Sequence, residues 1–325
     1  MGGDHAPRCV IEGVALAITR GVAGADELLL VGREAAVRPL LAELHVKGVE
    51  VLDAPEVVGM DESASVALRS KKNSSLAVAM RAVAEGRAAA FVSAGNTGAV
   101  VAASTLVLGR LKGVSRPGIA VPVPTRKGPA VVIDVGANIY CKPEHMLQYA
   151  VMASEYARAA FERSDPLVGL LNIGEEEGKG NPLIQQVHVL LQSAPLHYAG
   201  FVEGQDIMAG RTDVVVCEGF VGNVILKVAE GIAEYMGGLI KGAFGRHPPR
   251  PELAQAVGEA FERLDYSEYG GAPLLGVSAP VLIGHGRSTG HAIMNMIRAA
   301  RSSLQHDVGA HIEERLASMP REVIS

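Results

Sequence analysis

The sequence predicts an α/β protein with a doubly wound, mostly parallel sheet and a helical hairpin that leaves this sheet. Hydrophobic residues make up 48% of the 325 residues and charged residues 20%, so the chain can bury a large core. Short apolar runs of strand length alternate with segments of helix formers. The 38 glycines and an aromatic content of 4% indicate many tight turns around a core of small aliphatic side chains.

The predicted strands are continuous apolar runs, which are typical of strands buried on both faces of a sheet. In chain order they cover residues 28–32, 49–52, 88–93, 130–135, 167–172, 197–202, 213–218, 272–277 and 280–285. Segments 99–108, 144–163 and 182–192 are predicted as helices between them. Ligands of such sheets bind beyond the carboxyl ends of the strands, so functional residues are expected in the turns that follow the strands.

The pattern of short strands and helices changes after residue 221. A long helical stretch to about residue 244 is followed by a proline-rich break and a second predicted helix to about residue 264. We expect a single domain over residues 1–325, with a helical excursion at about 224–265 inside it. This excursion combines basic with apolar side chains, at Lys227, Leu239, Ile240, Lys241, Phe244, Arg246 and Arg250. It is predicted to help form a dimer and to contact anionic lipid, and the alternative is a solvated helix pair.

Charge and cysteine content argue against several classes of function. A formal net charge of -5 argues against nucleic acid as a partner. The three cysteines form no CxxC pair, which supports neither a disulfide framework nor a cysteine zinc site, and we expect no metal and no cofactor. The cysteine usage predicts a reducing compartment, and the first residues lack the basic start and apolar run of a signal peptide.

Four predicted strands end in turns that combine glycine with asparagine: Ser93–Gly98, Asp134–Asn138, Asn172–Gly180 and Glu218–Asn223. These turns would converge on one crevice if the strands are parallel. The first turn offers backbone amides, two hydroxyl groups and a helix N-terminus, which together suit phosphate, although an ordinary capped turn has the same appearance. The third turn contains Lys179 between two glycines, where it can reach an anion or remain an exposed loop lysine.

Nucleophilic chemistry has weak support in the sequence. Gly286–Gly290 matches the GxSxG pattern of serine hydrolases, but Asp307 and His311 lie four residues apart on one predicted helix, where they cannot complete a triad. Cys141 and Cys217 remain possible nucleophiles, and burial as small core residues is the expected alternative.

Seven segments in this order closely resemble the PlsX family of phosphate acyltransferases over almost the whole chain. They are Met1–Pro7, Lys71–Ser75, Ser93–Gly98, Asp134–Asn138, Asn172–Gly180, Glu218–Lys227 and Tyr266–Gly271. The resemblance implies that inorganic phosphate attacks the thioester of a long-chain acyl-acyl carrier protein, giving acyl phosphate for phospholipid synthesis and free carrier protein. It also implies a homodimer at the cytoplasmic face of the membrane, with a fold like phosphotransacetylase and isocitrate dehydrogenase.

The sequence departs from the family pattern in three places. Glu218 and Val221 stand where the family usually has aspartate and threonine, and Ile139-Tyr140 stands where it usually has Val-Asp. Members of the family usually carry an apolar strand ahead of the Met-Gly-Gly-Asp motif, and the printed sequence opens at this motif.

The chemistry of the reaction leads to roles for the candidate residues. Phosphate is a nucleophile near neutral pH and a thiolate is a competent leaving group, so no covalent enzyme intermediate is needed. Phosphate and the tetrahedral oxyanion both require positive groups or backbone amides in a site shielded from water. We therefore predict phosphate binding by Ser93, Gly95, Asn96, Thr97 and Gly98, and catalytic roles for Lys179, Asn138 and Asn223. The substrate pocket is predicted to include Asp134, Gly136, Asn172, Gly174, Glu218, Gly222 and His285.

The acidic carrier protein needs a basic docking patch, for which Arg69, Lys71 and Lys72 are candidates. Two alternative functions stay open. The first is a short-chain phosphate acyltransferase that uses acyl coenzyme A. The second is a non-catalytic scaffold for membrane lipid enzymes, which would release no free thiol.

Overall fold

The computed structural model describes residues 1–246, 248–262 and 266–319, in which two sheets are found. The smaller sheet pairs β1 (Leu29–Gly32) with β2 (Glu50–Asp53) in parallel. In spatial order, the larger sheet consists of β3 (Phe91–Ser93), β10 (Val281–Ile283), β9 (Ala272–Leu275), β4 (Gly118–Val123), β5 (Ala130–Ile133), β8 (Val214–Val216), β6 (Val168–Leu171) and β7 (Tyr198–Val202). The predicted α/β fold with a mainly parallel sheet is confirmed.

The larger sheet changes direction near its middle. Four of its seven neighbouring strand pairs are parallel, and the three antiparallel pairs all involve β9 or β4. Strand β4 was not predicted from the sequence. Its apolar run contains Pro122, which lacks a backbone N–H and so argues against an interior strand. Because of these reversals, β3 and β10 run opposite to β5, β8, β6 and β7.

Helices cover both faces of the larger sheet, and alternate residues of the strands pack against them. One face carries α6 (Pro143–Phe161), α7 (Pro182–Ser193) and α12 (Val308–Ala317). The other carries α3 (Ala64–Ser70), α4 (Ser75–Ala84), α5 (Thr97–Ala103), α8 (Gly204–Ala209) and the start of α9 (Gly219–Arg246). In β5, Val131 and Ile133 belong to the first core and Val132 to the second.

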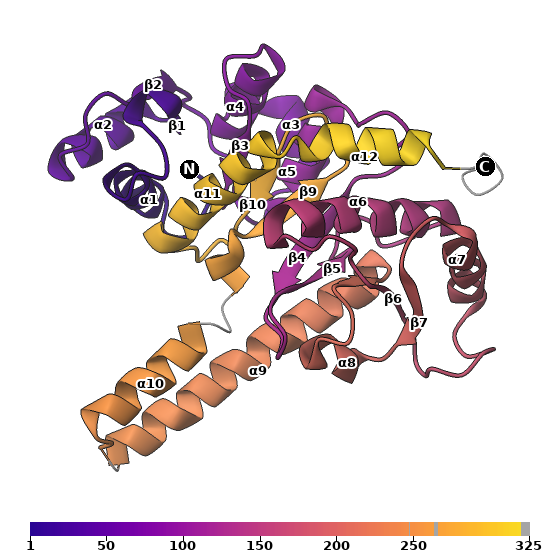
Figure 1. Ribbon diagram of the computed structural model, residues 1–325. Helices are drawn as coiled ribbons and strands as arrows, with labels where there is room; N and C mark the ends of the chain where they lie inside the picture. Colours follow the sequence, from indigo (N-terminus) through magenta and orange to yellow (C-terminus); the bar gives the residue numbers. More distant parts are fainter. Residues whose placement is uncertain (247, 263–265, 320–325) are drawn as a thin grey trace.

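The N-terminal segment forms a unit beside β3 (Figure 1). It contains α1 (Arg8–Thr19), the two-stranded sheet and α2 (Glu34–Glu43). Helix α1 packs closely on α11 (Gly290–Gln305), since a Cβ atom at Gly13 would lie 2.4 Å from the Cβ atom of Ile293. Shorter helical turns are Ala25–Glu27, Ser104–Leu108 and Tyr266–Tyr269.

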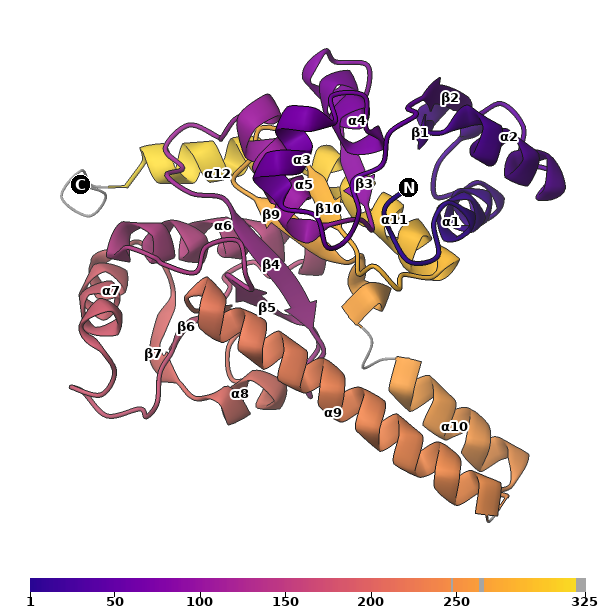
Figure 2. The ribbon, with the colours of Figure 1, turned by 180° about the vertical axis from the view of Figure 1, so that it is seen from behind.

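Helix α9 and helix α10 (Pro251–Glu262) lie side by side and project from the body of the molecule (Figures 1 and 2). The predicted excursion at 224–265 is helical over most of its length, and residues 247 and 263–265 lie outside the described residues. Only Gly219 and Gly222 of α9 are buried. No helix in the described part of the chain combines the length and apolar character that crossing a bilayer requires.

Candidate active site

The turn after β5 is organised by the carboxylate of Asp134, which is fully buried. Its Oδ1 atom accepts hydrogen bonds from the backbone N–H groups of Ile119 (2.9 Å), Gly136 (3.2 Å) and Ala137 (3.0 Å), and Oδ2 accepts from that of Asn138 (2.8 Å). Burial raises the pKa of this carboxyl group, while the four N–H donors act in the opposite direction. Asp134 therefore shapes the predicted substrate pocket from behind the turn.

Asn138 ties this turn to the protein core. Its side-chain Nδ2 atom donates to the backbone oxygen of Pro117 (2.7 Å) and to the hydroxyl of Tyr149 (2.8 Å). Tyr149 lies on α6 and is completely buried, and burial strongly raises the pKa of its hydroxyl, which thus stays protonated. The amide nitrogen of Asn138 is committed to structure.

The start of α9 packs directly against the Asp134 turn, as the prediction of convergent turns requires. A Cβ atom at Gly222 would lie 2.0 Å from the backbone oxygen of Asp134, so only glycine fits there. Asn223 is exposed and lies over Gly136. A Cβ atom at Gly136 would be 3.5 Å from the Asn223 Oδ1 atom. Glu218 is half-exposed at the end of β8.

The third predicted turn follows β6, which is parallel to its neighbour β8. Asn172 Nδ2 donates to the backbone oxygen of Lys179 (3.2 Å), closing the loop over the buried Gly174. The Lys179 side chain is exposed, and its ammonium group has no carboxylate partner within the described residues. It is a free cation in the same set of loops as Asn223.

The turn after β3 uses its asparagine differently. Asn96 Oδ1 accepts from the N–H of Ala99 (2.9 Å), and its Nδ2 atom donates to the backbone oxygens of Met60 (2.8 Å) and Glu62 (3.0 Å). Thr97 and Gly98 are exposed, and their backbone N–H groups have no acceptor in the described part of the chain. The exposed phosphate donors of this turn are therefore these two N–H groups and the Thr97 hydroxyl.

Ser93 of this turn, and two residues that follow the neighbouring strand β10, take part in local structure. Ser93 Oγ accepts from the N–H of Gly95 (3.1 Å). His285 is half-buried beyond β10, the parallel neighbour of β3, and its Nδ1 atom accepts from the N–H of Arg287 (3.1 Å). Ser288 of the GxSxG pattern is buried and is not presented as a nucleophile.

The predicted residues thus form two groups, which we call the β5-side loops (134–138, 172–180 and 218–223) and the β3-side loops (2–4, 58–62, 93–98 and 284–290). The predicted convergence of parallel strand ends holds for β5, β8 and β6 and fails for β3, which runs in the opposite direction. Helices α5 and α9 nevertheless lie over the same face of the sheet (Figure 2). Glu234 of α9 pairs with Arg287 of the β3-side loops at 3.9 Å.

Segments 2–4 and 58–62 were not assigned to the site from the sequence. A Cβ atom at Gly3 would lie 2.7 Å from the Ala94 backbone oxygen. The backbone N–H of Asp4 donates a hydrogen bond to the backbone oxygen of Gly286 (2.8 Å). The Gly2-Gly3 pair was the available signal, because close backbone approach favours glycine.

Neither candidate cysteine is prepared for nucleophilic attack. Cys217 is buried, and this burial raises the pKa of its thiol well above the usual value. Burial also raises the pKa of the half-buried Cys141. A thiolate is the reactive form, so both environments disfavour covalent catalysis. The described residues contain no group of three histidine, cysteine or acidic side chains placed to hold a metal ion.

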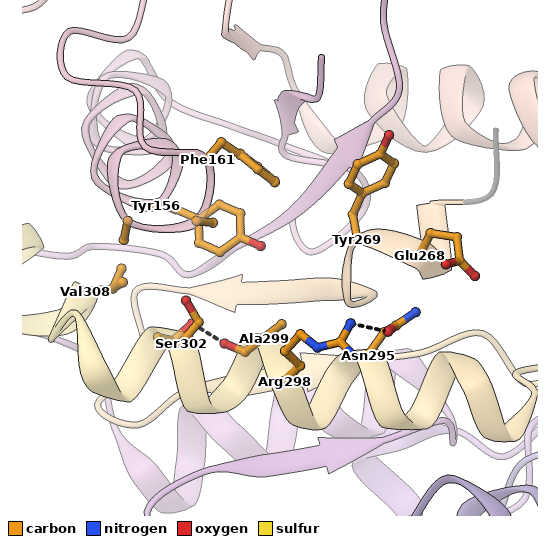
Figure 3. Close-up of a pocket in the computed structure, with 12 residues that line it drawn as sticks. Tyr156, Phe161, Glu268, Tyr269, Asn295, Arg298, Ala299, Ser302 and Val308 are labelled. Atoms are coloured by element: carbon orange, nitrogen blue, oxygen red, sulfur yellow. Dashed lines mark hydrogen bonds between the residues drawn. The ribbon is translucent and has the colours of Figure 1, made fainter. Parts of the chain in front are cut away.

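A pocket of about 190 Å³ lies between α6, α11 and the turn 266–269, apart from both groups of loops (Figure 3). Tyr156, Phe161 and Tyr269 face it, and Arg298 at its edge donates to Asn295 Oδ1 (2.8 Å). None of the predicted site residues lines this pocket.

Comparisons with known proteins decide the family. A family model described as "Fatty acid synthesis protein" matches residues 1–311. The phosphate acyltransferase of Heliobacterium modesticaldum is 47% identical, over 97% of this chain and 96% of its own length. That of Desulfitobacterium hafniense strain DCB-2 is 48% identical, over 99% of this chain and 96% of its own. The chain belongs to the phosphate acyltransferase family.

Solved structures support the fold of this phosphate acyltransferase family member. A phosphotransacetylase from Streptococcus pyogenes gives a TM-score of 0.59 at 17% identity, covering 90% of this chain and 92% of its own. EutD phosphotransacetylase from Staphylococcus aureus gives a TM-score of 0.56 at 15% identity, and the match covers 90% of this chain and 99% of its own. Family membership identifies the chain as an acyltransferase of fatty acid or lipid synthesis.

Proposed function

We propose that the protein transfers a long-chain acyl group from acyl-acyl carrier protein to inorganic phosphate, giving acyl phosphate for phospholipid synthesis. The observation that carries this proposal is that anion-binding groups are exposed while neither candidate cysteine is activated as a nucleophile. Lys179, Asn223 and the N–H groups of Thr97 and Gly98 are available to ligands, whereas both candidate thiols are held protonated. We infer that the two groups of loops, which flank the same face of the sheet, act together on one pair of substrates by positioning them and neutralising charge.

In the proposed reaction, a phosphate oxygen attacks the carbonyl carbon of the thioester. A C–O bond forms, the C–S bond breaks, and the carrier thiolate leaves and takes up a proton from water. Thr97 and Gly98 hold phosphate through backbone N–H groups, and Lys179 neutralises the tetrahedral oxyanion. Asn223 orients the phosphate or the carbonyl group, and Asn138 supports it through the fixed turn.

Exposed apolar side chains lie in the β5-side loops and directly after the first of them, which supports a fatty acyl substrate. Ile139 and Tyr140 are 58% and 92% exposed, Ile173 is 82% exposed and Phe220 is 61% exposed. Each lies within two residues of a predicted site residue in the sequence. Apolar side chains exposed around polar groups are typical of a site for an amphipathic ligand.

Basic residues on and after α3 are proposed to receive the acidic carrier protein. Arg69 and Lys72 are exposed. Lys71 is instead paired with Glu62, and its Nζ atom donates to the backbone oxygen of Val57 (2.8 Å). Arg69 and Lys72 are therefore the better candidates for an intermolecular contact.

Helix α9 supports the proposals of a homodimer and of peripheral contact with an anionic membrane at the cytoplasmic face. Exposed apolar residues recur along it at helical spacing, at Phe220, Val224, Val228, Ile232, Tyr235, Met236 and Leu239. A second copy of this helix would bury the stripe, and the basic residues of the hairpin would face lipid headgroups.

A thiol-release assay tests the proposed function. Long-chain acyl-acyl carrier protein should release free carrier thiol only when inorganic phosphate is present, together with one acyl phosphate per thiol. Faster turnover of acetyl coenzyme A would favour the short-chain alternative, with which the phosphotransacetylase fold is compatible. Binding of both substrates without thiol release would favour the scaffold.

A further inference from the structure

The pocket of about 190 Å³ between α6, α11 and the turn 266–269 has aromatic walls. Aromatic residues make up only 4% of the chain, yet Tyr156, Phe161 and Tyr269 all line this pocket. The Phe161 ring meets the other two edge to face, with its centroid 5.9 Å from that of Tyr156 and 6.4 Å from that of Tyr269. Tyr156 belongs to the core on the face of the sheet opposite α5 and α9. Such walls favour a ligand with an aromatic ring.

The Tyr156 hydroxyl is a buried polar group that faces this pocket. The Tyr156 side chain is 2% exposed, and its hydroxyl makes no hydrogen bond with any of the described residues. Figure 3 shows the hydroxyl directed into the open space of the pocket. Burial raises the pKa of this hydroxyl, which therefore remains a hydrogen-bond donor. A buried donor without an acceptor carries a free-energy cost, which an oxygen atom of a bound ligand would remove.

Arg298 supplies a positive charge at the edge of the pocket. Its Nη1 atom donates to Asn295 Oδ1 (2.8 Å), and its guanidinium group pairs with no carboxylate among the described residues. The carboxylate that lines the pocket, that of Glu268, accepts a hydrogen bond from His291 Nδ1 (2.8 Å) instead. A guanidinium group can form two parallel hydrogen bonds with a carboxylate, and one amide oxygen does not satisfy this capacity. The charge that remains available to a ligand is therefore that of Arg298.

We propose that this pocket binds a small aromatic carboxylate that carries a second oxygen group on its ring. The ring lies among the three aromatic side chains, the carboxylate accepts hydrogen bonds from Arg298, and the second oxygen accepts one from the Tyr156 hydroxyl. A cavity of about 150 Å³ holds one benzene molecule. The pocket is somewhat larger, so it has room for one ring with small substituents, and a long acyl chain is too large for it.

Calorimetric titration of the whole protein with 4-hydroxybenzoate tests this site, and we expect a Kd of about 1 mM or below. Arg298→Gln should weaken binding by about tenfold or more, because it removes the ionic partner of the carboxylate. Tyr156→Phe should weaken binding by about threefold or more and leave the melting temperature unchanged or higher, because the hydroxyl has no protein partner to lose. The matched control, Arg20→Gln, changes an exposed arginine outside the pocket and should leave the Kd unchanged.

Two further probes test the charge and the location of the bound ligand. 4-Hydroxybenzylamine, a cation of similar size, should bind at least about tenfold more weakly, and inorganic phosphate should not displace 4-hydroxybenzoate. Tighter binding of the amine, displacement by phosphate, or equal affinity of the wild-type, Arg298→Gln and Tyr156→Phe proteins would overturn the proposal, as would the lack of saturable binding. The titrations contain no acyl substrate, so their outcome does not depend on the proposed acyl transfer.

Discussion

The β5-side loops and the β3-side loops contain the same residue types, yet the structure uses them in different ways. On the β5 side a buried carboxylate, Asp134, takes up the backbone donors of its turn, and an amide and a cation remain exposed at Asn223 and Lys179. On the β3 side the amide of Asn96 is used internally, and backbone donors remain exposed. A glycine beside an asparagine therefore marks a constrained turn, and it does not say which group of that turn meets the ligand.

Replacing Lys179 should have the largest effect on catalysis. Lys179→Ala removes the free cation of the β5-side loops and should lower kcat for acyl phosphate formation by about a hundredfold or more, with unchanged melting temperature. Lys179→Arg should retain part of the activity, and Lys142→Ala, which removes another exposed loop lysine, should retain nearly all of it. Near-normal turnover of Lys179→Ala would move the catalytic charge to the β3 side.

Asp134→Asn should break the organisation of the β5-side turn. An amide of the same size has only one acceptor oxygen, so at least one buried backbone N–H loses its partner. We expect the free energy of unfolding to fall by at least about 2 kcal/mol in a urea titration, together with a drop in activity. The matched control, Asp165→Asn, changes an exposed carboxylate and should alter stability by under about 1 kcal/mol. Equal stability of the two variants would contradict a structural role for Asp134.

Variants of two helix-capping asparagines allow the two groups of loops to be compared directly. Asn96 caps α5 on the β3 side and Asn181 caps α7 next to the β5-side loops, each through a side-chain oxygen about 3 Å from a backbone nitrogen. Each alanine variant should lose about 1 kcal/mol of stability. Only Asn96→Ala should raise the KM for phosphate by severalfold, since it disturbs the turn that holds phosphate. A higher phosphate KM for Asn181→Ala alone would place phosphate on the β5 side.

The cysteine variants should have the smallest effect. Cys141→Ser and Cys217→Ala should each keep most of the acyl transfer activity, because neither thiol is poised as a thiolate. Quenched reactions analysed by mass spectrometry should show no acyl group on the protein. An acyl-cysteine that forms and decays at the rate of turnover would replace direct attack by a two-step route.

Several features of the fold could be predicted because they depend on short stretches of chain. The buried strands, the helix that follows residue 143 and the long hairpin after β8 agree with apolar periodicity and proline positions in the sequence. Strand β4 was not predicted, because Pro122 lies in its apolar run. The reversal of strand direction between β3 and β5 was therefore not predicted either. The direction of a strand depends on its neighbours in space, which no local pattern reveals.

The sequence by itself determined the element types, the glycine-rich turns at the strand ends and the resemblance to phosphate acyltransferases. Only the tertiary structure decided which polar groups of those turns stay available. The Asp134 carboxylate accepts a hydrogen bond from the N–H of Ile119, and the Asn96 side chain donates one to the backbone oxygen of Met60. Both hydrogen bonds join segments that are distant along the chain. Turn propensity acts within a few residues, whereas the burial of a carboxylate or an amide depends on the chain segments that pack around it.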